Sequence, residues 1–254
     1  MRFASLGSGS KGNATLIDDG QTCVLIDLGF TLKETERRLR RLAVDPKNID
    51  AILVTHEHAD HIHGVASFAR KYKTSVFLTH ATYDQKKMGL LPSMKTVNAH
   101  QKFEIGTLMI EPVAVPHDAR EPCQYIVSSG GHRIGVLTDL GHVTAHVEAC
   151  YADCHALLLE CNHDLQMLEE GPYPYVLKKR VAGDHGHLNN IQAAALLDKI
   201  ELSLLQHLVI SHISEKNNQP ELARNAVEPM LKNWSGSLHI AQQEFGFDWI
   251  QLSH

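Results

Sequence analysis

The sequence predicts an α/β fold, a four-layer αββα sandwich in which two β-rich halves pack face to face with helices outside. The first observation behind this prediction is that apolar strand patterns alternate with helical patterns in both halves of the chain. The second is that several of these strands are followed directly by His or Asp. The third is that no Pro/Gly/Ser-rich linker separates the halves, so we expect one domain over residues 1–254.

The first half predicts a β-meander followed by an α/β arrangement. Turns rich in Gly, Ser and Asp separate three short strands, at residues 2–6, 14–18 and 22–27. Leu32, Leu39 and Leu42 then recur at helical spacing among four arginines, which indicates an amphipathic surface helix. A buried strand, a helix and a second strand follow, at residues 50–55, 64–73 and 75–79.

The second half repeats this alternation. A hairpin pattern over residues 103–115 ends just before His117. Three more strands are predicted at 133–138, 156–160 and 207–210, and three helices at about 143–152, 189–200 and 220–231. Asp139 and His212 follow the first and the last of these strands, so polar side chains again stand at strand ends.

Composition narrows the class of protein. Hydrophobic residues make up 43% and charged residues 21% of the chain, which excludes a disordered or fibrous protein. The five cysteines form no CxxC pair, which favours reduced thiols over a disulfide framework or a cysteine-based zinc site. We expect a cytoplasmic protein without a membrane partner, because the sequence shows no secretory signal and no apolar run near the roughly 18 residues of a membrane span.

Histidine is the outlier of the composition, with 18 residues. Four metal-binding side chains lie within one segment that follows the strand at 50–55, His56-Glu57-His58-Ala59-Asp60-His61. We expect His56 and His58 to point the same way and share one divalent ion, whereas Asp60 and His61 turn toward a second ion. The alternative is a solvated turn that binds metal by accident, which the preceding buried strand disfavours.

A dinuclear site needs more ligands than this segment holds, and the later strand ends provide them. We expect His117 to complete the first set, Asp139 to bridge the two ions and His212 to complete the second set. Imidazole and carboxylate ligands without thiolates suit Zn²⁺, Mn²⁺ or Fe²⁺. The sequence therefore predicts two divalent metal ions, and these ligand types leave the metal open among the three.

The segment from Thr55 to Gly64 matches the signature of the metallo-β-lactamase superfamily, and the chain resembles this family along its length. The resemblance implies an αββα sandwich with a dinuclear site, usually a zinc site, at one edge and the seven ligands named above. Oxygen-reducing diiron members of the family carry Glu where this chain has His58, so the resemblance favours hydrolysis over redox chemistry.

Five further motifs resemble the YycJ/WalJ-type subgroup of this superfamily. They run from Gly7 to Asn13, Glu160 to Asp164, Gly171 to Pro174, Gly186 to Asn190 and Ser211 to Asn218. The resemblance implies a 5′-to-3′ exonuclease, with DNA favoured over RNA as the substrate. A formal net charge of −5 gives no general attraction to nucleic acid, but it does not exclude local binding of phosphates by metal ions.

The expected catalytic residues are Asp60, His187 and Glu160. A hydroxide that bridges the metal ions is the expected nucleophile, in the site that Asp60 helps to form. Phosphodiester cleavage expels a poor alkoxide leaving group, so a proton donor is needed, and His187 held by Glu160 suits that role. The alternative is that His187 serves only as a loop or capping residue before the helix at 189–200.

The candidate substrate contacts are His163, Ser10, Lys11 and Asn13. The Gly/Ser loop at 7–13 offers backbone N–H groups to a phosphate, although it lacks Walker spacing and a tight β-turn is the alternative. For His163 the alternative is a turn residue bonded to Asp164. Basic runs at 37–41 and 178–180 suit a nucleic-acid backbone, but such runs are more often solvated faces, and no aromatic interleaving supports stacking.

Two other functions stay open. A small-molecule hydrolase, such as a glyoxalase-II-like thioesterase or a lactonase, uses the same metal chemistry. The chain lacks the basic C-terminal helical region that binds glutathione in the former. A non-catalytic metal-binding regulatory protein is disfavoured, because every expected ligand position is filled. The sequence leaves the oligomeric state open.

Overall fold

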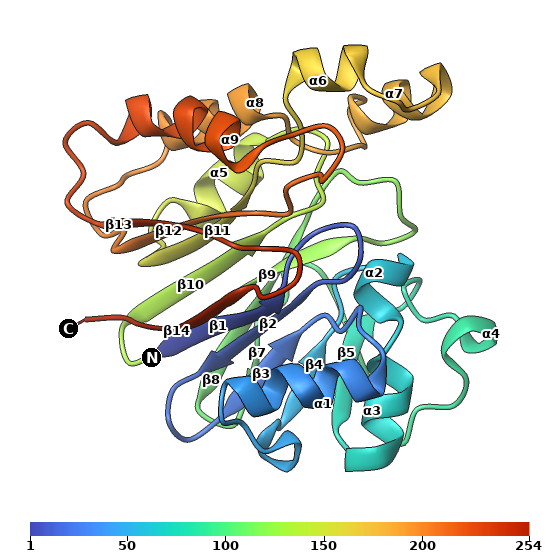
Figure 1. Ribbon diagram of the computed structural model, residues 1–254. Coiled ribbons are helices and arrows are strands. Elements are labelled where there is room, and N and C mark those ends of the chain that lie inside the picture. The colour runs from blue at the N-terminus through green and yellow to red at the C-terminus, as the bar shows by residue number, and fades with distance from the viewer. Residues whose placement is uncertain (254) are drawn as a thin grey trace.

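Two seven-stranded β-sheets face each other in the computed structural model, which describes residues 1–253 (Figure 1). The first sheet contains β1 (Arg2–Gly7), β2 (Ala14–Asp18), β3 (Cys23–Ile26), β4 (Ala51–Leu53), β5 (Ser75–Thr79), β6 (Met94–Val97) and β14 (Phe247–Gln251). The second contains β7 (Phe103–Ile105), β8 (Leu108–Ala114), β9 (Cys123–Ser129), β10 (His132–Leu137), β11 (Ala156–Glu160), β12 (His207–Ser211) and β13 (Ser237–Ile240). Their orders are β14-β1-β2-β3-β4-β5-β6 and β13-β12-β11-β10-β9-β8-β7.

Helices cover the outer faces of both sheets (Figure 1). Those of the first half are α1 (Leu32–Arg41), η1 (Pro46–Asn48), α2 (Ala59–Ile62), α3 (Val65–Tyr72) and α4 (Gln85–Met88). The helices of the second half are α5 (Ala145–Tyr151), α6 (Leu165–Glu170), α7 (Tyr175–Val181), α8 (Asn190–Leu197), α9 (Pro220–Val227) and η2 (Glu228–Leu231), of which α6 and α7 project from the edge of the sandwich. Within residues 1–253 no helix has the length and apolarity needed to cross a membrane.

Three apolar cores hold the structure together, one at each interface between the four layers of helices and sheets. Between the two sheets, Phe3 and Tyr125 are fully buried. Leu39 of α1 and Phe68 of α3 pack on the outer face of the first sheet. Ala193 of α8 packs with α5 and α9 on the outer face of the second sheet. The predicted αββα sandwich is confirmed.

The direction of the strands brings several loops to one edge of the sandwich. β3 to β6 run parallel, and so do β10 to β13. The histidine segment follows β4, while Asp139 and His212 follow β10 and β12. Because the carboxyl ends of parallel strands lie at the same edge of a sheet, these candidate ligands approach one another across the two sheets.

The C-terminal strand departs from the expected division into two halves. β14 pairs antiparallel with β1, so the first sheet includes a strand from the end of the chain. Arg38 of α1 is buried and donates to the carbonyls of Leu6 and Glu244, and Arg41 donates to the carbonyl of Phe245 at 2.8 Å. The basic run at 37–41 therefore binds the returning chain, and these two arginines are not free for a nucleic-acid backbone.

Several elements were not expected from the sequence patterns. They are β6, β9, β13, β14, α2, α4, α6, α7 and η1. Most of them are short or lie in polar stretches, but β9 has seven residues with the first five buried. The helix expected at 220–231 is divided into α9 and the 3₁₀ turn η2. Pro229 explains the change, because proline has no N–H to donate and its ring clashes with the preceding turn.

Asp19 links the two sheets away from the histidine segment. Its carboxylate accepts hydrogen bonds from the hydroxyls of Thr107 at 2.6 Å and Ser129 at 2.7 Å, both in the second sheet's half of the structure. The backbone N–H of Thr22 donates to it as well, at 2.9 Å. Although partial burial opposes ionisation, these hydrogen bonds lower the pKa of Asp19 to about 2.

Candidate metal centre

The histidine segment begins where β4 ends, and Asp27 fixes its course. The Asp27 carboxylate accepts hydrogen bonds from the backbone N–H and the hydroxyl of Thr55, each at 2.8 Å. The short helix α2 then turns Asp60 and His61 toward the second sheet. Gly29 lies so close to this turn that a Cβ atom would stand 1.8 Å from the carbonyl oxygen of Asp60. Only glycine fits there, so the loop after β3 and the turn of α2 support each other.

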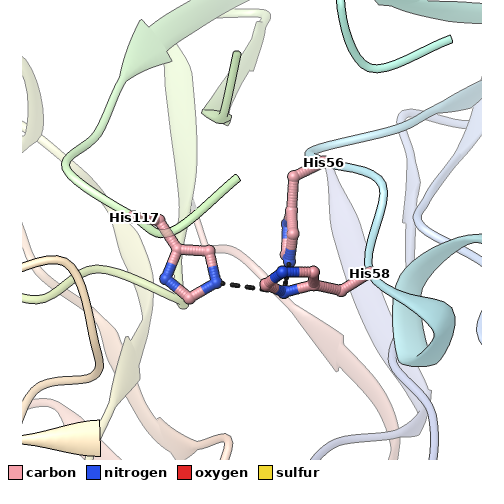
Figure 2. A group of neighbouring side chains, drawn as sticks. All are labelled: His56, His58 and His117. Carbon is pink, nitrogen blue, oxygen red and sulfur yellow. Dashed lines mark hydrogen bonds between the residues drawn. The ribbon is translucent and has the colours of Figure 1, made fainter. Parts of the chain in front are cut away.

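Three histidine side chains from two segments converge on one point (Figure 2). His58 Nδ1 lies 3.0 Å from His56 Nε2 and 3.3 Å from His117 Nε2. A tetrahedral zinc ion with Zn–N bonds near 2.0–2.1 Å would place its ligand atoms about 3.3–3.4 Å apart. The spacing of the three nitrogens therefore fits coordination of a single ion.

The opposite ring nitrogens of two of these histidines have acceptors of their own. The Thr55 hydroxyl donates its proton to Asp27, so it accepts a hydrogen bond from His56 Nδ1 at 2.9 Å. His117 Nδ1 donates to the carbonyl of Gly186 at 3.0 Å. Burial lowers the pKa of both histidines, and neighbouring histidines lower the pKa of His56 further. Both are therefore neutral imidazoles with Nε2 lone pairs aimed at one point, the form that binds a metal ion.

The second group combines two carboxylates with two histidines. His61 Nε2 lies 3.3 Å from Asp60 Oδ2 and 3.3 Å from Asp139 Oδ2. His212 Nε2 lies 3.7 Å from Asp60 Oδ2 and 3.6 Å from Asp139 Oδ1. Asp139 also groups with His56 and His61, so its carboxylate lies between the two sets of ligands.

Two atoms of this second group are left without a partner. Asp139 Oδ2 and His212 Nε2 are buried and have no hydrogen-bond partner within the described residues. Leaving a buried polar atom unpaired costs about 1–3 kcal/mol. Asp139 and His212 both line the pocket and belong to the candidate metal-binding groups, so a cation bound there would satisfy these atoms.

The charges around the second group also favour a cation. Burial opposes ionisation of Asp60, yet the charges of His61 and His212 hold its pKa far below the ordinary range. Burial likewise opposes a charge on His212, yet Asp139 and the neighbouring carboxylates raise the pKa of His212 to about 10. A divalent ion would supply this positive charge directly and leave both histidines neutral.

Glu160 holds two histidines at once. It is fully buried, and its Oε1 accepts from Nδ1 of His187 and from Nδ1 of His212, both at 2.8 Å. Its Oε2 accepts from the backbone N–H groups of Leu140 and Leu188. Burial opposes charge on His187, but the adjacent Glu160 carboxylate raises its pKa overall. The expected pairing of His187 with Glu160 is thus present as a hydrogen bond.

A pocket of about 340 Å³ opens over both groups of ligands. Its lining consists of Ser10, His58, Ala59, Asp60, Asp118, Asp139, Asn162, Tyr173, Leu177, Arg180, Val181, Gly186, His187, His212 and Ser214. Of the four candidate substrate contacts, only Ser10 belongs to it. The pocket therefore brings His187 and the metal-binding groups to one surface that a substrate can reach.

The other three candidate substrate contacts lie elsewhere. Lys11 is exposed and forms an ion pair with Glu215 at 2.7 Å. Asn13 is buried behind the site, where its Nδ2 lies 3.2 Å from Asp60 Oδ2 and 3.1 Å from His61 Nε2. His163 is fully buried. Their positions do not support direct contact with a substrate in this pocket; Asn13 instead supports the Asp60 loop.

Four further residues lie at the site; Asp27 and Asp118 were not expected there, whereas Tyr173 and Arg180 belong to stretches that the sequence analysis singled out without assigning them to the metal pocket. Asp27 accepts a hydrogen bond from His61 Nδ1 at 2.7 Å and so orients that ring. Asp118 lies 3.5 Å from His117 Nε2 and forms an ion pair with Arg180, and Tyr173 lines the pocket beside them. Asp27 carried the same signal as Asp139, an acid directly after an apolar strand.

Comparison with known proteins shows that most of the chain matches one protein family. The family described as Beta-lactamase superfamily domain matches residues 22–213. The chain is 32% identical over 242 residues to a Bacillus anthracis protein named exodeoxyribonuclease YycJ. The aligned region covers 91% of this chain and 89% of that protein.

Two solved structures share the fold over nearly their whole length. The metallo-beta-lactamase fold protein YhfI from Bacillus subtilis superposes with a TM-score of 0.75 at 16% identity, covering 98% of each chain. Zn²⁺-bound PqqB from Methylobacterium extorquens has a TM-score of 0.72 at 16% identity, covering 99% of this chain and 100% of that one. At these identities the likeness concerns the fold.

Proposed function

The chain belongs to the metallo-β-lactamase superfamily of hydrolases, and from that premise we propose that it is a metal-dependent phosphodiesterase, a 5′-to-3′ exonuclease acting on DNA. The proposal assigns one divalent ion to His56, His58 and His117. It assigns the other to Asp60, His61 and His212, with the Asp139 carboxylate between them. Zn²⁺ suits this set of imidazoles and carboxylates best, and Mn²⁺ and Fe²⁺ are the alternatives.

The metal pair defines the type of reaction. When bound, two such ions lower the pKa of a coordinated water toward neutrality and act as Lewis acids on a phosphate oxygen. The residues behind the ligands hold them in place: Asp27 orients His61, and Glu160 orients His212. Such supporting hydrogen bonds fix which ring nitrogen is free to bind the metal.

The observation that carries phosphodiester cleavage is the hydrogen-bonded pair of His187 and Glu160 at the pocket. His187 Nδ1 donates to Glu160 at 2.8 Å, so its Nε2 is the atom available to the pocket that His187 lines. A phosphodiester expels an alkoxide, which needs a proton as the bond breaks. A thioester expels a thiolate, which is stable without one, so this pair suits phosphodiesters better than thioesters.

The choice of DNA has a separate basis. The relative from Bacillus anthracis is named an exodeoxyribonuclease and is similar over most of both chains. The 5′-to-3′ direction rests on the motifs shared with the YycJ/WalJ-type subgroup. The chain carries a formal net charge of −5, so it does not attract DNA as a whole, and any attraction to phosphates is local to the metal pocket.

The test combines metal analysis with a panel of substrates. We expect the purified protein to carry close to two metal ions per chain and to hydrolyse bis(p-nitrophenyl) phosphate in a chelator-sensitive manner. On 5′-phosphorylated DNA labelled at either end, it should release nucleotides from the 5′ end, and faster than from matching RNA. Turnover of S-lactoylglutathione without turnover of any phosphodiester would refute the proposal. Asp60→Ala is the control variant, which should lose metal and all activity.

A further inference from the structure

The α6–α7 hairpin projects from the edge of the sandwich (Figure 1), and residues of α7 line the metal pocket. No residue of α7 is buried, and two of its apolar side chains are largely in solvent, Tyr175 at 69% and Val176 at 79% exposure. Apolar side chains scattered singly on a surface are ordinary, but two adjacent ones on an outlying helix beside an active-site pocket point to a binding surface.

The helix α7 has two opposite faces with different surroundings. Leu177, Arg180 and Val181 line the metal pocket. Tyr175, Lys178, Lys179 and Ala182 line a separate groove between α6 and α7. At 3.6 residues per turn, the mean directions of the two sets are roughly 155° apart. α7 is therefore the wall between the pocket and the groove.

The groove, with a volume of about 420 Å³, combines an apolar floor with positive charge. Leu165, Leu168 and Tyr175 supply the apolar part, and Lys178 and Lys179 the charge; Glu169 is the one acidic residue in its lining. The Lys179 ammonium lies 4.8 Å from the centre of the Tyr175 ring. An exposed aromatic ring next to lysines is the combination on which single-stranded nucleic acids stack.

An ion pair and a backbone hydrogen bond, from the N–H of His187 to the carbonyl of Val181, link α7 to the metal site. Arg180 binds Asp118, whose carboxylate lies 3.5 Å from His117 Nε2 and 3.8 Å from His58 Nε2. A helix with its side chains is about 10–12 Å across, and stacked nucleotides in one strand are spaced about 3.4 Å apart. The groove thus lies about three nucleotides from the metal pocket.

We propose that the α6–α7 groove binds a base of single-stranded DNA about three nucleotides from the phosphate held in the metal pocket. This inference rests on the proposed nuclease function and adds to it a preference for strands longer than a dinucleotide. Tyr175 stacks on the base, while Lys178 and Lys179 contact the neighbouring phosphates. Pocket and groove share α7 as a wall, so one strand can cross the helix and occupy both.

The experiment compares substrates of different length with the metal-loaded protein. For Tyr175→Ala we expect the KM of a 5′-phosphorylated decanucleotide to rise at least fivefold relative to that of a dinucleotide, equal to about 1 kcal/mol of stacking. Tyr175→Phe keeps the aromatic ring and should restore the wild-type ratio. Lys179→Gln should make decanucleotide binding less salt-dependent, by about 0.7 in the slope of log K against log salt. Lys95→Gln, on the edge strand β6, is the control for loss of one exposed lysine.

Three outcomes would overturn the inference. One is an unchanged ratio of the two KM values in Tyr175→Ala. Another is an equal loss of turnover with the decanucleotide and the dinucleotide in Tyr175→Ala, which would mean that Tyr175 has a structural role. The third is a concentration-dependent dimer in light scattering that Tyr175→Ala abolishes without changing DNA turnover, since the groove would then bind a second copy of the chain. Failure of the nuclease proposal can be told apart from failure of this inference, because wild-type protein would then hydrolyse neither length of DNA nor bis(p-nitrophenyl) phosphate. In that case, binding of a phosphorothioate decanucleotide would still test the groove.

Discussion

Replacing His187 by alanine tests the proton-donor role most directly. In the structure His187 is oriented by Glu160 and faces the pocket, while it stands outside the two groups of metal-binding residues that we assign to the ions. The variant should therefore keep its metal content. Loss of a general acid slows a reaction by about 10²–10⁴-fold. At about 1.4 kcal/mol per factor of ten, this corresponds to a rise of roughly 3–6 kcal/mol in the activation free energy.

The size of the effect should depend on the leaving group. DNA cleavage expels an alkoxide that needs a proton, so kcat for DNA should fall by the full factor. p-Nitrophenolate departs without a proton, so hydrolysis of bis(p-nitrophenyl) phosphate by His187→Ala should fall much less. The measurement is kcat on both substrates, together with metal content by mass spectrometry. His185→Ala is the matched control, because His185 lies two residues away and is exposed outside the pocket lining.

Two results would contradict this reasoning. Full activity of His187→Ala on DNA would show that the leaving group receives its proton elsewhere. An equal loss on both substrates would show that His187 acts by holding the ligands, through the Glu160 carboxylate that it shares with His212.

Three further variants test the support of the site and of the fold. Asp27→Asn weakens the hydrogen bond that orients His61 and should lower metal affinity by about 10–100-fold, measured by competition with a chelating dye. Gly29→Ala places a methyl group against the Asp60 carbonyl and should lower both the Tm and the metal content; a folded variant with two ions per chain would refute the close contact. Asp19→Asn should cost about 1–2 kcal/mol at pH 7 in denaturant unfolding. Because the folded-state pKa of Asp19 is lowered to about 2, its contribution is present above pH 4 and lost as the pH falls from about 4 to 2, where wild type and variant should converge.

The strand-end residues explain why much of the candidate site could be predicted from the sequence. The segment from His56 to His61 is local, and Asp139 and His212 each follow an apolar strand pattern. Parallel strands bring such positions to one edge of a sheet, so proximity follows from topology without knowledge of side-chain packing. The same rule applied to Asp27 would have added the carboxylate behind His61.

Residues whose surroundings depend on distant segments could not be predicted in this way. Lys11 and His163 belong to distinctive motifs, but only the packed structure shows that Lys11 turns to Glu215 and that His163 is buried. Arg38 reads as part of a basic surface helix, yet the chain near Glu244 returns to cover it. Nor does the pattern around Tyr175 reveal that one face of α7 lines the pocket and the other the groove.

The pairing of β14 with β1 has a consequence for how the protein is made. Arg2 pairs with Gln251, so the edge of β1 stays open during translation until the strand Phe247–Gln251 has been synthesised. At 5–20 residues per second, the interval between β2 and β14 is roughly 10–45 s. An open strand edge invites pairing with other chains, and contacts between distant segments form slowly. We therefore expect the nascent chain to benefit from fast synthesis, or from a chaperone that covers this edge, more than a protein whose first sheet closes early.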